Sequence, residues 1–169
     1  MRKTVLLLSF FLSACTGSSP DSHYFTLSPV PPQDQPRPGR PALHVTAFHL
    51  PQLYDRPQMV FRTGAQSVDI DETDRWAEPL DRMAARILAQ DLAPRRPQPS
   101  GVEVTLQVTI DDFIADRTGN AHLSGSWKAG GKAGAFDLTA ESGGASPDQA
   151  AAALSTLLGR LASEIDRGN

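Results

Sequence analysis

The chain of 169 residues is long enough for one domain, and its 40% of hydrophobic residues suffices for a packed core. The formal net charge of −3 gives no basic excess, so we expect neither a nucleic-acid partner nor electrostatic adhesion to an anionic membrane. Cys15 is the only cysteine, which excludes an internal disulfide.

Residues 1–14 have the order of a secretory signal peptide. Arg2 and Lys3 form a basic start, and the following apolar run is too short to span a bilayer. The run ends in Leu12-Ser13-Ala14-Cys15, which resembles the lipobox of bacterial lipoproteins. The open alternative is an ordinary export signal followed by an incidental, unpaired thiol.

The lipobox resemblance implies that Cys15 is the first mature residue and carries acyl chains such as palmitate. Each buried methylene contributes about 0.8 kcal/mol and one chain anchors a protein only marginally, so several chains are needed for a firm anchor. Thr16 occupies the position at which an aspartate would retain a bacterial lipoprotein in the inner membrane. The resemblance therefore implies a lipid anchor in the outer membrane, on its periplasmic face.

Residues 15–40 are predicted to be the lipidated N-terminus and a proline-rich tether. Half of the 14 prolines lie between Pro20 and Pro41, and such a segment stays extended and semi-rigid. One island, His23-Tyr24-Phe25-Thr26-Leu27, has the composition of a strand and is expected to dock at an edge of the domain. The rest of the tether is expected to hold a single domain, residues 41–169, away from the membrane.

The first half of this domain predicts three strands and a helix. Residues 43–48 form a strand that Pro51 ends, and residues 59–62 and 66–70 flank a short glycine-containing connection as a hairpin. The hydrophobic period then becomes helical. Apolar side chains share one helix face at Leu80, Met83, Ala84, Ile87, Leu88 and Leu92. Pro79 suits the first turn of this helix, and Pro94 closes it.

The second half predicts three more strands and a second helix. Residues 102–110 alternate strictly between apolar and polar side chains, and residues 123–128 and 135–139 pair through Gly130-Gly131. Ser146-Pro147-Asp148-Gln149 is a capping box that starts a helix with an apolar face. The expected fold is α+β, a mostly antiparallel sheet with two amphipathic helices packed on one face.

No pattern of catalytic or metal-binding residues emerges. The four histidines have no short metal-ligand spacing, and no nucleophile elbow or phosphate-binding glycine loop is present. Asp111-Asp112 follows the clearest strand, as a bulge or a solvated strand end, and neighbouring side chains in a strand diverge. We therefore expect no enzyme, no metal site and no cofactor.

Two denser patches, residues 50–62 and 74–80, are candidates for contact with a partner. Tyr, Trp and Arg are the usual anchors of protein interfaces. The candidate partner-binding residues are Tyr54, Asp55, Arg56, Arg62, Trp76 and Glu78. In the structural alternative, Asp55-Arg56-Pro57 is a turn, Trp76 is a plug between helix and sheet, and Glu78 stabilises the start of a helix. Contact between copies of the chain, as a homo-oligomer, also remains open.

The order of these motifs resembles one family. The lipobox is followed by Tyr24-Phe25-Thr26-Leu27, then by Leu50-Pro51-x-x-Tyr54-Asp55-Arg56-Pro57-Gln58-Met59-Val60-x-Arg62, then by Arg75-Trp76-Ala77-Glu78-Pro79-Leu80. This order is similar to that of the ABC-type transport auxiliary lipoproteins, the PqiC-like family. The resemblance implies a lipoprotein that serves membrane integrity by working with an MCE (mammalian cell entry) protein and, through it, an ABC transporter in intermembrane lipid transport. The alternative is a stand-alone envelope lipoprotein, an inhibitor or structural module without a transporter partner.

Overall fold

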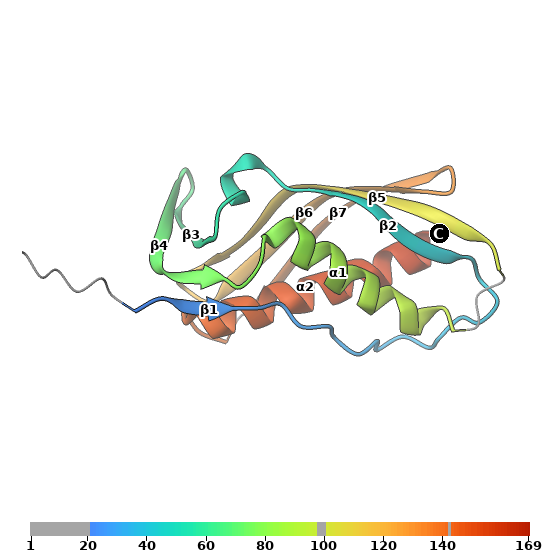
Figure 1. Ribbon diagram of the computed structural model, residues 1–169, viewed down its shortest axis with the longest axis horizontal. Helices are drawn as coiled ribbons and strands as arrows, with labels where there is room; N and C mark the ends of the chain where they lie inside the picture. Colours follow the sequence, from blue (N-terminus) through green and yellow to red (C-terminus); the bar gives the residue numbers. More distant parts are fainter. Residues whose placement is uncertain (1–20, 98–100, 142) are drawn as a thin grey trace, which may run out of the picture.

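A computed structural model describes residues 21–97, 101–141 and 143–169. These residues form two layers, a seven-stranded sheet with both long helices on one of its faces (Figure 1). The expected α+β class with a mostly antiparallel sheet is confirmed. The predicted signal peptide and the predicted lipidation site, Cys15, lie outside the described residues.

The elements follow one another in an order close to the expected one. They are β1 (His23–Phe25), β2 (Ala42–His49), the 3-10 helix η1 (Gln52–Tyr54), β3 (Gln58–Gly64), β4 (Ser67–Trp76), α1 (Leu80–Leu92), the 3-10 helix η2 (Ala93–Arg95), β5 (Glu103–Asp116), β6 (Asn120–Ala129), β7 (Lys132–Glu141) and α2 (Pro147–Gly168). The sheet order is β1-β4-β3-β5-β6-β7, and β2 also pairs with β5.

β5 organises the sheet because two strands share one of its edges. β2 runs parallel to the first half of β5, and β3 runs parallel to its last two residues. The chain between β2 and β3 must therefore leave the sheet beside the middle of β5 and return further along it. This excursion contains η1 and most of the first candidate patch.

β5 is longer than the predicted strand because it continues through Asp111-Asp112. The pairing of β5 with β6 shifts register between Ile110 and Asp112, which is a bulge. Of the two alternatives for this acidic pair, the bulge is confirmed. β5 continues through the two adjacent carboxylates because Asp112 accepts hydrogen bonds from Tyr54 and Arg62, which belong to other elements.

The helix starts differ in how they are stabilised. Ser146 and Gln149 form the predicted capping box at the start of α2. α1 starts at Leu80 as predicted, but Pro79 is its N-cap and no side chain caps it. Glu78 forms an ion pair with Arg86, two turns along the helix, instead of a cap.

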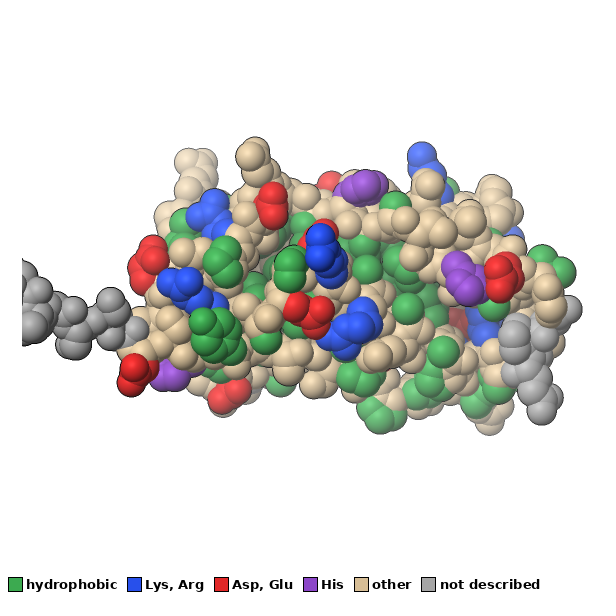
Figure 2. Space-filling view, viewed as in Figure 1, with side chains coloured by type: hydrophobic (Ala, Val, Ile, Leu, Met, Phe, Trp, Pro, Cys, Tyr) green, Lys and Arg blue, Asp and Glu red, His purple; other side chains and the backbone are tan. Residues whose placement is uncertain are grey.

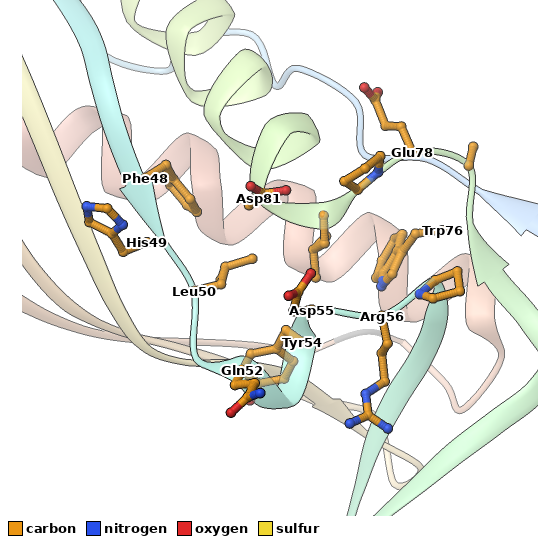
Figure 3. Close-up of a pocket in the computed structure, with 14 residues that line it drawn as sticks. Phe48, His49, Leu50, Gln52, Tyr54, Asp55, Arg56, Trp76, Glu78 and Asp81 are labelled. Carbon is orange, nitrogen blue, oxygen red and sulfur yellow. The ribbon is translucent and has the colours of Figure 1, made fainter.

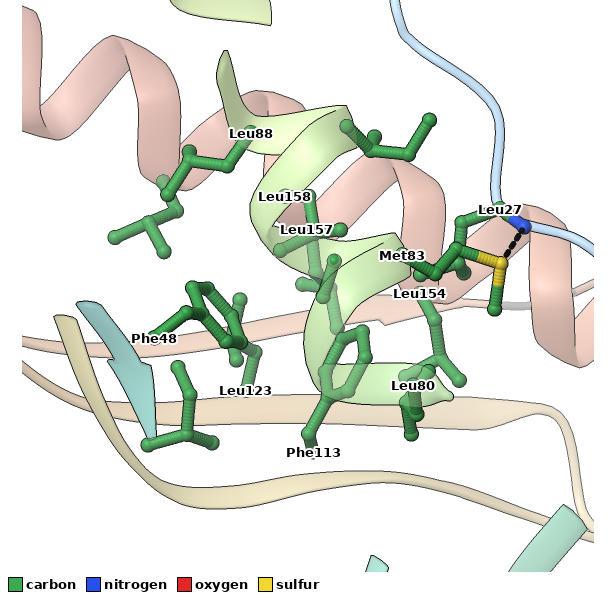
Figure 4. Packing of buried hydrophobic residues seen from close by; sticks show 14 of the residues in the cluster. Leu27, Phe48, Leu80, Met83, Leu88, Phe113, Leu123, Leu154, Leu157 and Leu158 are labelled. Carbon is green, nitrogen blue, oxygen red and sulfur yellow. Dashed lines mark hydrogen bonds between the residues drawn. The ribbon is translucent and has the colours of Figure 1, made fainter. Parts of the chain in front are cut away.

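The core lies between the sheet and the helix pair (Figure 4). Phe113 and Leu123 project from the sheet toward α1 and α2, whose Met83 and Leu157 are fully buried between them. Leu27, from the segment after β1, closes the core at one side, and its backbone N–H donates to Met83 Sδ at 3.2 Å. Leu27, the last residue of the island predicted to dock on the domain, is thus part of the hydrophobic core.

Residues 26–41, which we call the strap, pack along the helices and do not extend away from the domain. The spacer role predicted for residues 28–40 is therefore wrong, whereas the docking predicted for residues 23–27 is confirmed, with β1 as an edge strand parallel to β4. Val30 lies against Gly159 of α2, where a Cβ atom would come within 3.0 Å of the Val30 side chain. The prolines of the strap keep it extended, but an extended chain also fits the groove between two helices.

Buried charged groups under the strap hold it in place. The Val30 N–H donates to Asp91 Oδ1 at 2.7 Å, and Arg96 Nη1 donates to the Pro41 carbonyl at 2.8 Å. Arg40 Nη1 donates to the Asp166 carbonyl at 2.7 Å. These partners belong to α1, to α2 and to Arg96 just after η2, so the strap ties the two helices and the residues after α1 together.

Among the described residues, no helix combines the length and the hydropathy needed to cross a membrane.

Candidate functional site

The two candidate patches come together at one groove. It has a volume of about 750 Å³ and lies between the β2–β3 excursion and the start of α1 (Figure 3). Phe48 and Leu50 form one wall, and Trp76 forms the opposite wall. Two segments that are separate in the sequence, residues 48–57 and 76–81, thus line a single surface.

Trp76 is the structural plug expected by the alternative reading. It is 6% exposed, belongs to the core cluster and lies at the end of β4, next to Phe25 of β1. Its backbone N–H donates to the Pro57 carbonyl at 2.7 Å, which fixes the excursion against the end of the strand. Trp76 therefore holds the groove in shape and lines it as well.

The rim of the groove carries charges of both signs around an apolar centre (Figure 2). Asp55 and Asp81 are exposed and lie on opposite sides of the groove, on the excursion and on α1. Glu78 is half-buried and paired with Arg86. Arg56 uses its Nε to donate to the Leu53 carbonyl at 2.8 Å, and its guanidinium points away from Trp76 (Figure 3).

Tyr54, a candidate partner-binding residue, is not available at the surface. Pro51 and Pro57 bracket the excursion, but Tyr54 is 5% exposed, and its hydroxyl donates to Asp112 Oδ1 at 2.6 Å. Arg62 binds the other oxygen of the same carboxylate, also at 2.6 Å. The excursion folds back because its tyrosine finds a buried acceptor on the bulged strand. Tyr54 is thus not an exposed anchor, and of the four candidate residues in this patch, Tyr54, Asp55, Arg56 and Arg62, only Asp55 is exposed.

Asp112 is the centre of a polar network that the sequence did not reveal. His122 of β6 places Nδ1 2.9 Å from Asp112 Oδ2 and Nε2 2.9 Å from Asp137 Oδ1 of β7. Ser124 lies between the two acids in the strand register, so His122 reaches both of them diagonally. The alternation of His122 and Ser124 with the apolar Ala121 and Leu123 indicates that the polar side chains share one face of the strand. It does not indicate which residues they contact, because that depends on how neighbouring strands are aligned.

The network shifts the pKa values of its members. Burial alone would lower the pKa of His122, but the hydrogen bonds to Asp112 and Asp137 outweigh burial and raise it. Burial would raise the pKa of Asp112, but the hydrogen bonds from Tyr54 and His122 lower it. Burial and the neighbouring Asp112 raise the pKa of Tyr54 above its ordinary range. The network is thus most stable with a charged imidazolium between two carboxylates.

We expect His122 to make the stability depend on pH. A histidine whose pKa is raised in the folded state contributes stability that is complete below its unfolded pKa of about 6.5 and is lost as the pH rises through the folded pKa. In His122→Gln, this loss of unfolding free energy between about pH 6 and about pH 8 should disappear. Urea unfolding at both pH values, with NMR titration of the imidazole, measures it.

His44→Gln is the matched control, because His44 is exposed and pairs with the exposed Glu103. It should keep the pH dependence of the wild type. An unchanged pH dependence in His122→Gln would show that the two carboxylates do not stabilise the imidazolium.

Comparison with known proteins places the chain in a family. Residues 25–166 match the profile of the ABC-type transport auxiliary lipoprotein component. The chain belongs to this family. All residues of the groove and of the His122 network lie within the matched region of this auxiliary lipoprotein.

Relatives and solved structures agree with this assignment. The auxiliary lipoprotein is 26% identical over 132 residues to intermembrane transport lipoprotein PqiC of Escherichia coli strain K12, covering 73% of this chain and 71% of PqiC. The PqiC of Shigella flexneri matches to the same extent. The crystal structure of an uncharacterized protein has the same fold, with a TM-score of 0.72, 21% identity and coverage of 88% of this chain and 98% of that one. A protein from Xanthomonas campestris has a TM-score of 0.61 at 15% identity, covering 87% and 93%.

Within the described residues, no three His, Cys, Asp or Glu side chains gather so as to hold a metal ion.

Proposed function

We propose that this auxiliary lipoprotein is a lipid-anchored periplasmic subunit of an MCE and ABC-type intermembrane lipid transport system. Its role is to dock or assist the MCE component without catalysing a reaction. The observation that carries the proposal is the convergence of two separated motifs on one groove in a chain of this family. The printed names of the relatives, which describe an intermembrane transport lipoprotein, support it.

The groove has the properties of a docking surface. Its apolar walls are rigid, because Phe48, Trp76 and Leu80 belong to the core, so a partner side chain meets a preformed surface. Its rim carries exposed carboxylates, and pairing with positive charges of the partner would fix how the partner is aligned in the groove. A partner segment with an apolar anchor in the groove would thus gain both affinity and specificity.

The anchor belongs to the same proposal. Acylated Cys15 would insert in the outer membrane, and the domain would face the periplasm. Membrane fractionation tests this, and recovery of the protein with inner-membrane markers contradicts it. Cys15→Ala should leave an unlipidated precursor that does not reach the outer membrane.

We expect Ala77→Arg to weaken docking without unfolding the domain. The Ala77 side chain is exposed and lines the groove, while its backbone N–H donates to the Phe25 carbonyl at 2.8 Å, a bond that the substitution keeps. A long charged side chain fills the groove, so binding of the MCE protein should weaken by about tenfold or more, equal to about 1.4 kcal/mol. Co-purification and titration with the MCE protein measure this.

Ala152→Arg is the matched control, because Ala152 is equally exposed but lies on α2, outside the groove. It should bind as the wild type does. Binding by Ala77→Arg at wild-type strength would remove the groove from the interface. If the wild-type lipoprotein captures no MCE protein from solubilised membranes, the stand-alone envelope lipoprotein becomes the better reading.

A further inference from the structure

The domain has two poles, and the chain enters it at one of them. The near pole carries β1 and the start of α2, and the far pole carries the β6–β7 turn and the C-terminus (Figure 1). The C-terminal position is fixed by two contacts: Lys132 Nζ donates to the Asn169 carbonyl at 2.8 Å, and Asn169 Nδ2 donates to the Ala129 carbonyl. β1 pairs with β4 at His23, so the chain is fixed at the near pole from that residue on.

The docked strap leaves a short connection to the proposed anchor. Cys15 and His23 are eight positions apart, and a fully extended chain advances at most about 3.6 Å per position. The near pole therefore lies within about 29 Å of the lipidated residue. Had the strap been the free spacer that the sequence suggested, the reach as far as Ala42 would be about 97 Å.

The domain is longer than this connection. α2 has 22 residues, which corresponds to about 33 Å, and it runs from the near pole to the far pole. In an inverted orientation, with the far pole on the bilayer, β1 would stand at least that far above the surface and beyond the reach of Cys15. The strap thus excludes an inverted orientation.

We propose that the near pole is the membrane-facing surface of the lipidated protein, and that the far pole points away from the bilayer. The inference rests on the anchor in the proposed function. Tyr24 lies on β1 beside Arg75 of β4 and is 66% exposed, and a tyrosine at this position suits the headgroup region.

The charges of the near pole make the contact sensitive to the lipid. Acidic residues outnumber basic ones there, and they comprise Asp21, Asp69, Asp71, Glu72, Asp74 and Asp116 against Arg75 and Arg117. Such a surface approaches zwitterionic headgroups more closely than anionic ones. The anchor, rather than charge attraction, holds this pole at the membrane.

The two tryptophans report on the two poles. Trp76 pairs with Phe25 of β1, whereas Trp127 lies against Gly168 at the end of α2. The full lipidated protein is reconstituted in phosphatidylcholine vesicles that contain a dansyl-labelled lipid. Trp127→Phe leaves Trp76 as the only donor, and Trp76→Phe leaves Trp127. Energy transfer to the dansyl lipid should be higher from Trp76, and it should fall when phosphatidylglycerol is added.

Two further measurements make the test decisive. The comparison is repeated with both tryptophans intact, using thiol labels at Thr118→Cys, in the turn between β5 and β6, and at Ala133→Cys, beside the turn between β6 and β7. Insertion of ten Gly and Ser residues before Asp21 lengthens the reach beyond α2, so the difference between the poles should shrink. Equal transfer from both poles in the unmodified chain would overturn the proposed orientation. Failure of the wild type to float with vesicles would instead refute the anchor itself.

Discussion

Replacement of Trp76 by alanine is expected to destabilise the domain by about 3–5 kcal/mol. Trp76 is almost fully buried where β4, β1 and the excursion before β3 meet, and its removal leaves a cavity that these three segments cannot fill together. Thermal and urea unfolding of the domain measure the loss. Because Trp76 is also a wall of the groove, partner binding should fall in parallel with stability.

Trp76→Phe is the matched variant, because it keeps an aromatic ring and most of the buried area. It should lose much less stability than the alanine variant. If Trp76→Ala melts as the wild type does but no longer binds its partner, the indole contributes to the interface and not to the core.

The second large effect is expected from Asp166→Ala. Asp166 is 3% exposed, and its Oδ1 accepts a hydrogen bond of 2.7 Å from Nε of Arg96, which is itself 4% exposed. The alanine variant leaves the Arg96 guanidinium buried without its counter-charge, which costs about 3–5 kcal/mol. Arg37 and Arg40 of the strap also lose a nearby carboxylate, so the strap should become more accessible to proteases.

A double variant separates the charge from the packing. Asp166→Leu combined with Arg96→Met removes both charges and keeps apolar volume, so it should recover much of the stability that Asp166→Ala loses. If the double variant is as unstable as the single one, the loss arises from packing or from the strap and not from an unpaired guanidinium.

Helices and strands whose pattern lies within one short stretch of sequence were predictable. The apolar face of α1, the capping box of α2 and the strict alternation of β5 each lie within one short stretch of sequence, and each was found at the expected place. The strap was not predictable in this way. Its prolines indicate an extended chain equally well whether it is solvated or packed, and its binding residues, Asp91 and Asp166, are far away in the sequence.

In the candidate site, too, the residues were predictable from local sequence but their contacts with distant residues were not. Residues 50–57 and 76–80 were singled out by composition, and the structure brings them to one groove. The direction of each side chain was not predictable, because Tyr54 turns inward only where Asp112 offers an acceptor across the sheet. His122 was missed for a related reason, since its two carboxylates come from strands on either side of it.

The strap can fold only after the last helix is available. Ser28 contacts Ser155 and Arg40 contacts Asp166, so the first segment of the domain needs the last helix, 127 and 126 positions later, to complete its fold. Such high contact order slows folding, because the loop must close before the contacts form. A chain exported from its N-terminus therefore remains unfolded at that end until its final residues have crossed the membrane. Under the proposed lipid anchor, the segment next to Cys15 would thus stay open to the processing and acylating enzymes throughout translocation.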